Sequence, residues 1–322
     1  MRILIAGGAG FIGSQVAKRL IDEGHEVIVV DNLERGDLRR LEGRTENPKF
    51  TFYKIDVLDY DKLVKVAKDI HVVMDFVAHK IPRYSSAMNT LKRNVKGCEN
   101  LLEIARINKA KFILSSTSDV YGKSEEFPLR EDGDLLLGPT TSRRWSYSVS
   151  KIYNEHLAFA YNDEYGIPVV ILRFFGVYGP WQHMDWWGGP TGVFLKNILG
   201  GKPVPIHGDG NQKRSFVYIE DLVEAVVRAT FIKEAENEII NIGTEEEISI
   251  IELAKLIYRF SGTKYKLDIE YIPYSSFSKN YEDVKRRIGD IQKMKKILNF
   301  TPSVNLKEGI QRFISWYKSF KE

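Results

Sequence analysis

The first thirty-one residues combine apolar runs with a glycine-rich turn in a way that predicts a strand, a helix and a second strand. Residues 2–6 form a short apolar, β-branched run, which is typical of a buried strand. Residues 14–23 carry apolar side chains at helical spacing. Residues 27–30 are all Val or Ile and predict a second buried strand, which ends at Asp31. The pattern therefore predicts a βαβ unit with a glycine turn, residues 7–13, after its first strand.

The turn reads GGAGFIG, with Phe11 and Ile12 between its last two glycines. Gly7 permits a tight turn, Gly10 lets the backbone approach a pyrophosphate, and Gly13 lets the helix pack closely on the strand. The free N–H groups at the start of the helix and the helix dipole favour phosphate groups. The turn therefore predicts a dinucleotide site. An ordinary glycine-rich turn of an α/β domain is the alternative, and it leaves the acid at the end of the second strand unexplained.

Asp31 favours one of two dinucleotides. At the tip of the second strand its carboxylate can accept hydrogen bonds from the adenosine ribose hydroxyls. A 2′-phosphate at the same place would face this carboxylate, and a like-charge contact of that kind costs several kcal/mol. We therefore expect NAD rather than NADP. We expect Arg35, Arg39 and Arg40, the basic residues that could offset the repulsion, to lie in a solvated loop.

Strand and helix patterns continue to alternate up to residue 174. Apolar runs over 49–57, 72–78, 111–116 and 169–174 predict strands, and helical spacing predicts helices over 59–68, 85–108 and 145–164. Such alternation implies a doubly wound parallel sheet of the Rossmann type, in which ligands bind at the carboxyl ends of the strands. Asp56 and Val57, at the end of the third strand, can bracket an adenine ring. Ala78, His79 and Lys80 follow the fourth strand at the same edge.

The composition changes after residue 175. Residues 181–190 (WQHMDWWGGP) are aromatic and glycine-rich and have no period, so they predict a loop with a role in the site or at an interface. Short strand and helix patterns alternate from there to the end. We therefore expect a Rossmann domain over residues 1–175 and a smaller mixed α/β domain over 176–322 that mainly binds substrate. Residues of about 214–242 are expected to return to the first domain.

The composition is typical of a soluble globular protein. The 322 residues carry a net charge of +4, a mild and dispersed excess that fits a phosphate-bearing ligand and gives no reason to expect nucleic acid. Cys98 is the only cysteine, so no disulfide framework is expected, and no pair of histidines has metal-ligand spacing. No apolar run is long enough for a bilayer and no signal-peptide pattern is visible, so we expect a cytoplasmic protein without metal or membrane contact.

Tyr147 and Lys151 are candidates for proton transfer. Four residues apart, they lie on one face of the predicted helix. A phenol has an unperturbed pKa of about 10, and a nearby ammonium together with a cationic nicotinamide ring lowers this pKa by favouring the phenolate. Tyr147 can then act as a general base on a sugar or alcohol hydroxyl as hydride leaves the carbon. Lys151 can also bind the nicotinamide ribose.

Further polar side chains are expected at the same edge of the sheet. Residues 115–122 (SSTSDVYG) follow the fifth strand directly, and Thr117 can hydrogen-bond the reacting hydroxyl; a simple Ser/Thr turn is the alternative. Asn94 interrupts the apolar face of its helix, either as a satisfied core amide or as a bond that holds the active-site helix. Lys80 and Arg83 can meet a phosphate or a sugar acid, and a solvated basic turn is equally consistent with their positions.

Nine stretches spread over almost the whole chain carry motifs that occur together. They are GGAGFIG (7–13), DNL (31–33), DV (56–57), SSTSDVYG (115–122), Tyr147 with Lys151, LRFFGVYGP (172–180), GDGNQKRSFVY (208–218), NIG (241–243) and DI (290–291). Together they resemble an extended short-chain dehydrogenase/reductase of the nucleotide-sugar epimerase, dehydratase and decarboxylase family. These motifs are specific for the family and poorly specific within it.

The resemblance implies a mechanism. NAD stays bound, Tyr147 removes the proton from the sugar 4-hydroxyl, and hydride passes from C4 to NAD. The resulting 4-keto sugar can be reduced on its other face by a 4-epimerase, lose a neighbouring group in a 4,6-dehydratase, or lose the carboxyl group of a uronic acid in a decarboxylase. By the same resemblance Arg214 and Arg287 hold the nucleotide diphosphate or the sugar, and two long helices per subunit form a homodimer.

The expected site residues fall into three groups. Catalysis is assigned to Tyr147, Lys151, Thr117 and Asp119. NAD is expected to contact Gly7, Gly10, Phe11, Ile12, Gly13, Asp31, Asn32, Asp56, Val57, Ala78, Lys80, Asn94, Ser115, Tyr147 and Lys151. A nucleotide-diphosphate sugar is expected to contact Arg83, Thr117, Arg144, Gly176, Val193, Arg214 and Arg287.

Asp119 and its surroundings distinguish the three reactions. Dehydratases of the family carry Asp-Glu immediately before Val-Tyr-Gly, whereas this chain has Ser118-Asp119 and lacks the first acid. Uronate decarboxylases carry Thr-Ser-Glu, and here Thr117 begins a similar stretch whose acid is one methylene shorter. Arg144 resembles both the decarboxylases and some uronate epimerases. Many members have Asn where Gly176 stands, so another group must contact the substrate phosphate here.

We therefore predict an NAD-dependent nucleotide-sugar 4-epimerase, with a UDP-sugar as the expected substrate. A UDP-glucuronate-type decarboxylase is the alternative, ahead of a 4,6-dehydratase, and all three share the oxidation at C4. Two other classes fit less well. A non-catalytic Rossmann protein that senses the cofactor has no need of Tyr147 and Lys151, and a net NADP-linked reductase would prefer a basic residue where Asp31 stands.

Overall fold

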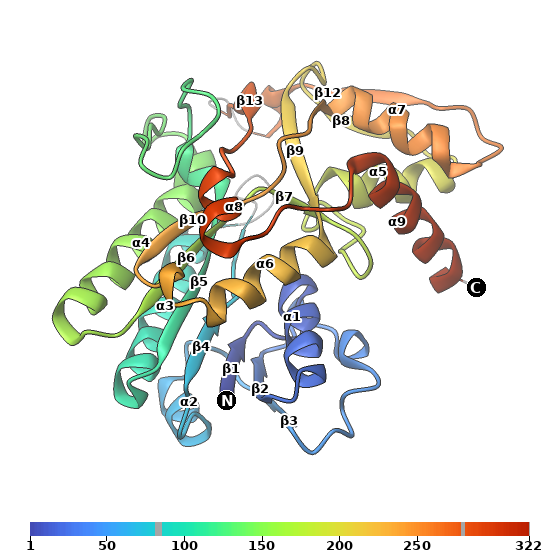
Figure 1. The fold of residues 1–322 in the computed structure, drawn as a ribbon. Helices are drawn as coiled ribbons and strands as arrows, with labels where there is room; N and C mark the ends of the chain where they lie inside the picture. The colour runs from blue at the N-terminus through green and yellow to red at the C-terminus, as the bar shows by residue number, and fades with distance from the viewer. Residues whose placement is uncertain (81–85, 278–280, 322) are drawn as a thin grey trace.

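A seven-stranded sheet, parallel throughout, lies at the centre of the computed structural model, which describes residues 1–80, 86–277 and 281–321 (Figure 1). In spatial order its strands are β10 (Glu238–Ile242), β6 (Val169–Phe174), β5 (Lys111–Thr117), β4 (Val72–Asp75), β1 (Arg2–Ala6), β2 (Glu26–Asp31) and β3 (Phe50–Lys54). Strand order reverses between β1 and β4, which places a ligand-binding crevice at their carboxyl ends. The expected Rossmann-like α/β fold is confirmed.

Helices cover both faces of this sheet. On one face α3 (Ala87–Asn108) and α4 (Ser146–Tyr165) pack side by side, and on the other lie α1 (Phe11–Asp22) and α6 (Ile219–Phe231) (Figure 1). Because both faces are covered, the inner strands are almost continuous runs of Val, Ile and Leu rather than alternating ones. Two shorter helices, α2 (Tyr60–Val66) and α8 (Gln292–Leu298), complete this part.

Side-chain hydrogen bonds set the ends of several elements. The Asp59 carboxylate accepts a hydrogen bond from the backbone N–H of Lys62 at 3.2 Å and caps α2, as the sequence predicts. β4 ends at Asp75, three residues earlier than predicted, because the Asp75 carboxylate accepts the backbone N–H of Val77 at 2.9 Å and turns the chain. Residues 76–80 therefore form a loop along the ligand-binding edge.

The remaining strands and helices form a second layer above that edge. β9 (Lys213–Tyr218) pairs with β7 (Gly176–Tyr178), β11 (Glu247–Ser249) and β13 (Arg286–Arg287), and β8 (Val204–His207) pairs with β12 (Ile269–Ile272). The helices here are α5 (Pro190–Leu199), α7 (Ile250–Ser261) and α9 (Leu306–Lys321). Short 3₁₀ turns are η1 (Leu38–Leu41), η2 (Ser118–Tyr121), η3 (Arg143–Trp145), η4 (Lys233–Ala235) and η5 (Tyr274–Ser276). One hydrophobic cluster joins this layer to the sheet through α6.

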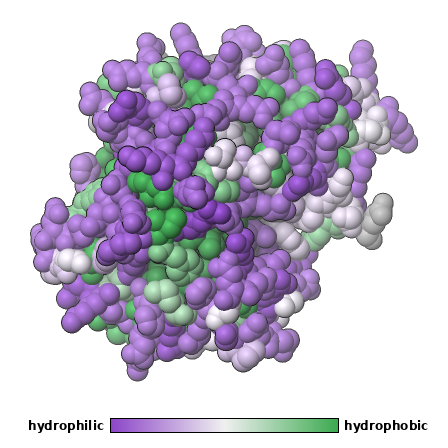
Figure 2. Space-filling view, in the orientation of Figure 1, coloured by the Kyte–Doolittle hydropathy of each residue, from purple (hydrophilic) through white to green (hydrophobic). Residues whose placement is uncertain are grey.

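The face of the molecule in Figure 2 is mostly hydrophilic, and hydrophobic side chains gather toward its middle. Over the part of the chain that the structure describes, no helix is both long enough and apolar enough to cross a membrane. Cys98 is buried in α3 as a core residue.

Candidate active site

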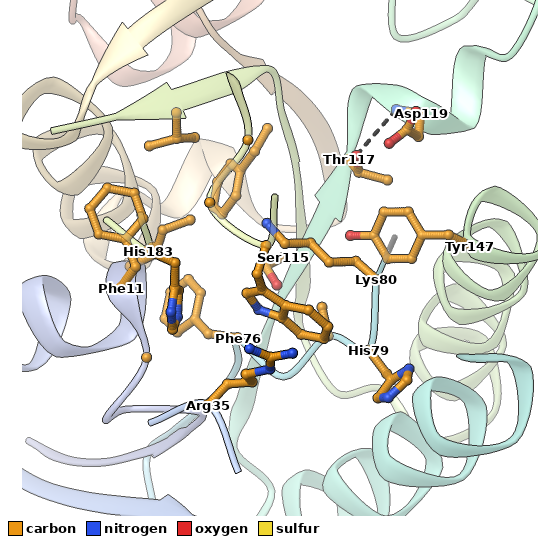
Figure 3. A pocket seen from close by; sticks show the side chains of 18 of the residues that line it. Phe11, Arg35, Phe76, His79, Lys80, Ser115, Thr117, Asp119, Tyr147 and His183 are labelled. Atoms are coloured by element: carbon orange, nitrogen blue, oxygen red, sulfur yellow. Dashed lines mark hydrogen bonds between the residues drawn. The ribbon is translucent and has the colours of Figure 1, made fainter. Parts of the chain in front are cut away.

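A cavity of about 470 Å³ lies between the sheet edge and the second layer. This volume is within the range of about 300–1,000 Å³ that is usual for ligand sites. Figure 3 shows Lys80, Thr117 and Tyr147 pointing into the cavity from one side, opposite Phe11 and His183. The glycine turn and the ends of β2, β4 and β5 line one part, and residues of β7, β9 and β13 line the other.

The glycine turn leaves no room for side chains, as a dinucleotide cradle requires. A Cβ atom on Gly13 would lie 2.4 Å from the Gly7 carbonyl oxygen, so the start of α1 packs directly on the turn. Gly7 has a φ of +75°, and a Cβ there would lie 2.9 Å from the backbone of Phe76. Gly10 also lines the cavity, together with Phe11, Ile12 and Gly13 of the first turn of α1, whose backbone N–H groups suit a pyrophosphate.

Asp31 organises the turn as well as facing the cavity. Its carboxylate accepts hydrogen bonds from the backbone N–H of Ala9 at 3.0 Å and of Leu33 at 2.8 Å. Burial raises the pKa of Asp31, and these two hydrogen bonds oppose the shift. The remaining acceptor capacity of the carboxylate can serve the ribose hydroxyls. The sequence suggested the ribose contact and gave no sign of the bond to Ala9.

Arg40 is not in a solvated loop, and that prediction is wrong. Its side chain is 6% exposed and donates hydrogen bonds to the carbonyl oxygens of Ala9 at 3.0 Å, Arg35 at 3.2 Å and Trp181 at 3.2 Å. Arg40 therefore ties the glycine turn to the aromatic loop that begins at Trp181. Its backbone acceptors lie on three separate segments, a convergence that local sequence cannot reveal.

The other two arginines after β2 are also held. Arg39 pairs with Asp37 at 2.6 Å, and Arg35 pairs with Asp185 at 3.4 Å. The side chains of Arg35 and Arg39 are 50% and 67% exposed, as predicted for a solvated loop, whereas the Asp31 carboxylate lines the cavity at the end of β2. This arrangement fits a 2′-hydroxyl and disfavours a 2′-phosphate.

Asp56 lies at the end of the cavity where the sequence analysis expects the adenine ring. Its carboxylate accepts hydrogen bonds from the Asn32 side-chain amide at 2.9 Å and from the Leu58 backbone N–H at 3.0 Å, and Arg93 pairs with it at 2.8 Å. Burial would raise the pKa of Asp56, but these bonds outweigh burial and lower it. Val57 lies behind, against α3. The role of Arg93 was not visible in the sequence because it lies 37 residues away from Asp56.

Asn94 joins the two helices beside the cavity. It accepts the backbone N–H of His79 at 2.7 Å and donates to Ser150 Oγ at 3.0 Å and to the His79 carbonyl at 3.2 Å. The amide is thus satisfied, and it also connects the loop after β4 to α4. Lys80 follows in this loop, where burial lowers its pKa to about 8 against the opposing effect of Asp119.

Tyr147 and Thr117 meet at the end of β5. Tyr147 is nearly buried, and Thr117 lines the same cavity, where its hydroxyl accepts a hydrogen bond from the Asp119 backbone N–H at 3.2 Å (Figure 3). Burial, with the negative charge of Asp119, raises the pKa of Tyr147, and the neighbouring Thr117 hydroxyl opposes this shift. A cationic nicotinamide ring nearby would favour the phenolate and bring this pKa down. The Lys151 ammonium donates hydrogen bonds to the Ser115 carbonyl at 2.8 Å and to the Val77 carbonyl, in the loop after β4, at 3.4 Å.

Three arginines and two aspartates cluster at the far end of the cavity. Asp119 pairs with Arg144 at 2.7 Å and with Arg287 at 2.8 Å. Asp283 pairs with Arg214 at 3.2 Å and lies 3.6 Å from Arg144. The three guanidinium groups exceed the two carboxylates by one positive charge. Among the described side chains, the Nε atoms of Arg144 and Arg287 are buried without a hydrogen-bond partner, so the cluster retains donors for an anion.

The charges of this cluster set its protonation. Burial alone would raise the pKa of Asp119, but Arg287 and Arg144 outweigh burial and hold it far below its usual range. Burial lowers the pKa of Arg287 to about 10, with Asp119 opposing. Asp119 is therefore a carboxylate at neutral pH, and it has no proton to donate as a general acid.

Not every expected substrate contact among the described residues lines the cavity. Val193 lies in the hydrophobic core and is not among the described residues that line the cavity. Gly176 does line it, and a Cβ there would lie 2.6 Å from the Phe216 ring, so an asparagine does not fit without moving that ring. Arg83 lies outside the described residues. The assigned roles of these three positions stay predictions.

Sequence reasoning missed part of the lining. His183, Trp186 and Trp187 reach the cavity from the aromatic loop, and His207 and Tyr281 reach it from the second layer. The lack of period and the three tryptophans suggested a functional loop but not where it lies. Within the described ranges, no group of three or more His, Cys, Asp or Glu side chains is arranged to hold a metal ion.

Similarity to known proteins extends over nearly the whole chain. The family model described as "NAD dependent epimerase/dehydratase family" matches residues 3–243. A UDP-N-acetyl-alpha-D-glucosaminuronate decarboxylase from Bacillus cytotoxicus is 34% identical over 99% of this chain and 98% of its own. A putative UDP-glucose 4-epimerase from Methanocaldococcus jannaschii is 36% identical over 98% of each chain. The UDP-glucuronic acid 4-epimerase from Bacillus cereus, solved with UDP-glucuronic acid and NAD, is 30% identical with a TM-score of 0.86, covering 99% of this chain and 100% of its own.

These matches confirm the resemblance that the motifs indicate, and NAD is the cofactor of the matching family. The glycine turn without room for side chains, Asp31 at the end of β2 and the groove toward Tyr147 fit that cofactor. The relatives include epimerases and decarboxylases, so the match does not separate these reactions. The chain belongs to the NAD-dependent epimerase/dehydratase family.

Proposed function

We propose that this protein is a nucleotide-sugar 4-epimerase whose substrate is a UDP-uronate, a UDP-sugar with a carboxylate at C6. The observation that carries the proposal is the surplus guanidinium charge around Asp119, within the same cavity as Tyr147 and Thr117. The diphosphate of any UDP-sugar can account for part of this charge, but a neutral sugar gives no reason for the rest. A carboxylate does, because guanidinium groups bind it through charge-assisted hydrogen bonds.

The residues at the end of β5 would carry out the proton transfer. Tyr147 removes the proton of the sugar 4-hydroxyl, and Thr117, which lines the same end of the cavity, donates a hydrogen bond that orients that hydroxyl. NAD supplies the acceptor for the hydride of C4. Lys151, one helical turn after Tyr147 on α4 and held by the Ser115 carbonyl, would supply the positive charge that favours the phenolate.

The same arginines favour epimerisation over loss of CO₂. A uronate oxidised at C4 is a β-keto acid, and decarboxylation moves an electron pair from its carboxylate into the ring. A guanidinium that binds the carboxylate stabilises the negative charge before CO₂ is lost. It stabilises the ground state more than the transition state and so raises the barrier to decarboxylation. Dehydration in turn needs a proton donor beside the sugar, and Asp119 is held as a carboxylate by Arg144 and Arg287. The 4-keto sugar would then rotate within the cavity and be reduced on its other face.

A UDP-uronate decarboxylase is the second candidate. It is favoured by the stretch Thr117-Ser118-Asp119 and by relatives named as decarboxylases, among them the Bacillus cytotoxicus protein and a UDP-glucuronic acid decarboxylase from Arabidopsis thaliana, 33% identical. All of these act on a sugar with a carboxylate, by name. The two candidates therefore share a substrate class and differ only in the fate of the 4-keto sugar.

Incubation of the purified protein with UDP-glucuronate, UDP-galacturonate and UDP-glucose separates the candidates. We expect the two uronates to interconvert with no change in mass, seen as a new anomeric signal by NMR, and UDP-glucose to react more slowly. A loss of 44 mass units as CO₂ would assign the decarboxylase instead. A preference for UDP-glucose would contradict the role given to the arginines.

Arg287→Gln tests that role directly. The change removes one guanidinium from a buried charge cluster, and the loss of such a partner costs about 2 kcal/mol or more. We expect kcat/KM for the uronate to fall at least about thirtyfold, with a much smaller fall for UDP-glucose. Arg286→Gln is the matched control, since this neighbour on β13 is exposed and pairs with Glu247 outside the cavity. Equal losses for the two sugars would contradict a carboxylate contact.

A further inference from the structure

The aromatic loop between β7 and α5 is a braced structure rather than a slack connector. We call residues 181–190 the tryptophan strap. The buried Gln182 side chain donates hydrogen bonds to the Gly188 carbonyl and, at 2.9 Å, to Thr191 Oγ, which follows the strap. A Cβ on Gly188 would lie 2.0 Å from the His183 carbonyl oxygen, so the strap folds tightly back on itself. Its shape is therefore set largely by contacts within the segment and with Thr191.

One side of the strap is fastened to the segment that follows β2. Arg40 donates to the Trp181 carbonyl at 3.2 Å. Arg35 pairs with Asp185 at 3.4 Å, and its guanidinium carbon lies 4.6 Å from the centre of the Trp187 ring. A guanidinium at this distance from an indole face makes a cation–π contact. The strap thus contacts the loop that begins at the adenosine end of the groove.

The strap also reaches the loop after β4. The Trp187 ring meets the His79 ring edge-on, with 5.7 Å between the ring centres and an angle of 82° between the planes. In the sheet β1 lies between β2 and β4. The glycine turn, which follows β1, thus lies between the two loops that Trp187 contacts, and Trp187 lines the same cavity as Gly7 and Gly10. Figure 3 shows Arg35 and His79 at the rim of the same cavity.

We propose that the tryptophan strap closes over the pyrophosphate part of bound NAD and controls its release, with Arg35 and Trp187 as the latch. The turn beneath offers backbone N–H groups to the pyrophosphate, and Trp187 crosses above it. For NAD to leave, the contacts of Trp187 with Arg35 and His79 and the pair of Arg35 with Asp185 must open together. The inference rests on NAD as the cofactor of the family and not on which sugar the enzyme converts.

Retention of NAD by the strap suits an enzyme that oxidises and then reduces the same substrate molecule. An enzyme that returns the hydride to the same sugar has no need to exchange its cofactor. Slow release keeps the cofactor in place while the neutral or anionic sugar comes and goes through the second layer. Trp186, next along the strap, faces that second layer, because it stacks on His207 with 4.0 Å between ring centres. The two neighbouring tryptophans would then serve the two ends of the cavity.

The test measures NAD release from the purified holoenzyme of Trp187→Ala, Trp187→Phe and Trp186→Ala. Bound NAD is quantified after gel filtration and acid extraction, and its release is followed by a coupled dehydrogenase that reduces only free NAD. We expect release at least about tenfold faster from Trp187→Ala. Trp187→Phe, which keeps a ring for Arg35 and His79, should restore most of the retention. Trp186→Ala should release NAD at the wild-type rate.

Two results would overturn the proposal. If Trp187→Ala releases NAD at the wild-type rate and only raises KM for the sugar nucleotide, the strap belongs to the substrate. If Trp186→Ala speeds release as much as Trp187→Ala, the effect is a general loosening of the loop and not a latch. Circular dichroism of each variant checks that the fold is retained, and the rate of NAD release does not depend on the identity of the sugar.

Discussion

Tyr147→Phe is expected to lower kcat by about 10²–10⁴-fold, the usual contribution of a general base. The change removes one oxygen and keeps the ring, which is nearly buried in α4 beside the end of β5. Packing and the groove for NAD are therefore preserved. The substrate 4-hydroxyl loses the group that takes its proton, while the hydrogen bond from the Asp119 N–H to Thr117 is unaffected. Turnover of whichever sugar nucleotide proves active is measured alongside the NAD content of the purified variant.

The matched control for this result is Tyr165→Phe. Tyr165 lies on the same helix and loses the same oxygen, but it is exposed, and it does not line the cavity among the described residues. Its activity should equal that of the wild type. Full activity in Tyr147→Phe would contradict the assignment of proton transfer to this residue. A loss of activity accompanied by a loss of NAD would show that the tyrosine acts through the cofactor site instead.

The parts of the fold and site that could be predicted are those encoded locally. The alternation of apolar strands and amphipathic helices over residues 2–174 is enough to indicate a parallel sheet, because each element buries its own pattern. The glycine turn and Asp31 lie within one βαβ unit, and Tyr147 and Lys151 lie on successive turns of one helix. In each case the functional spacing is short enough to be read from neighbouring residues.

The features that could not be predicted depend on contacts between distant segments. Arg40 looks like a surface residue until the strap brings the Trp181 carbonyl to it from 141 residues away. Gly176 looks like the loss of an asparagine until Phe216, from β9, is seen to occupy the space. Asp283 carries no motif, and only the pairing of β13 with β9 brings it to Arg214. Such partners follow from the packing of the second layer, which has no strong local pattern.

A second buried ion pair supports the catalytic segment from behind. Glu155 on α4 and Arg173 on β6 are 4% and 3% exposed, and they are joined by two hydrogen bonds of 2.7 and 3.1 Å. The Ser116 hydroxyl also donates to Glu155. Ser116 immediately precedes Thr117, so this pair holds the end of β5 against α4. We therefore expect the loss of either charge to lower the stability of the protein and to disturb the position of Thr117.

Glu155→Ala is expected to lower the free energy of unfolding by about 3–5 kcal/mol, since it leaves the Arg173 guanidinium buried without its counter-charge. Urea titration followed by circular dichroism measures the change. Replacing both residues, Glu155→Met with Arg173→Met, should recover most of the loss, because a buried ion pair exchanged for apolar side chains of similar volume is often close to neutral. A double variant no more stable than Glu155→Ala would show that the loss came from packing and not from the unpaired charge.

Glu308→Ala is the comparison for this result, since it removes one partner of an exposed ion pair. Glu308 pairs with Arg312 across one turn of α9, and both side chains are 44% exposed. Water screens an exposed pair of this kind, so its loss should change the free energy of unfolding by less than about 1 kcal/mol. The comparison separates the cost of burying an unpaired charge from the small value of a surface pair. If Glu155→Ala cost no more than Glu308→Ala, the pair behind Ser116 would not stabilise the protein, and the end of β5 would depend on its strand neighbours alone.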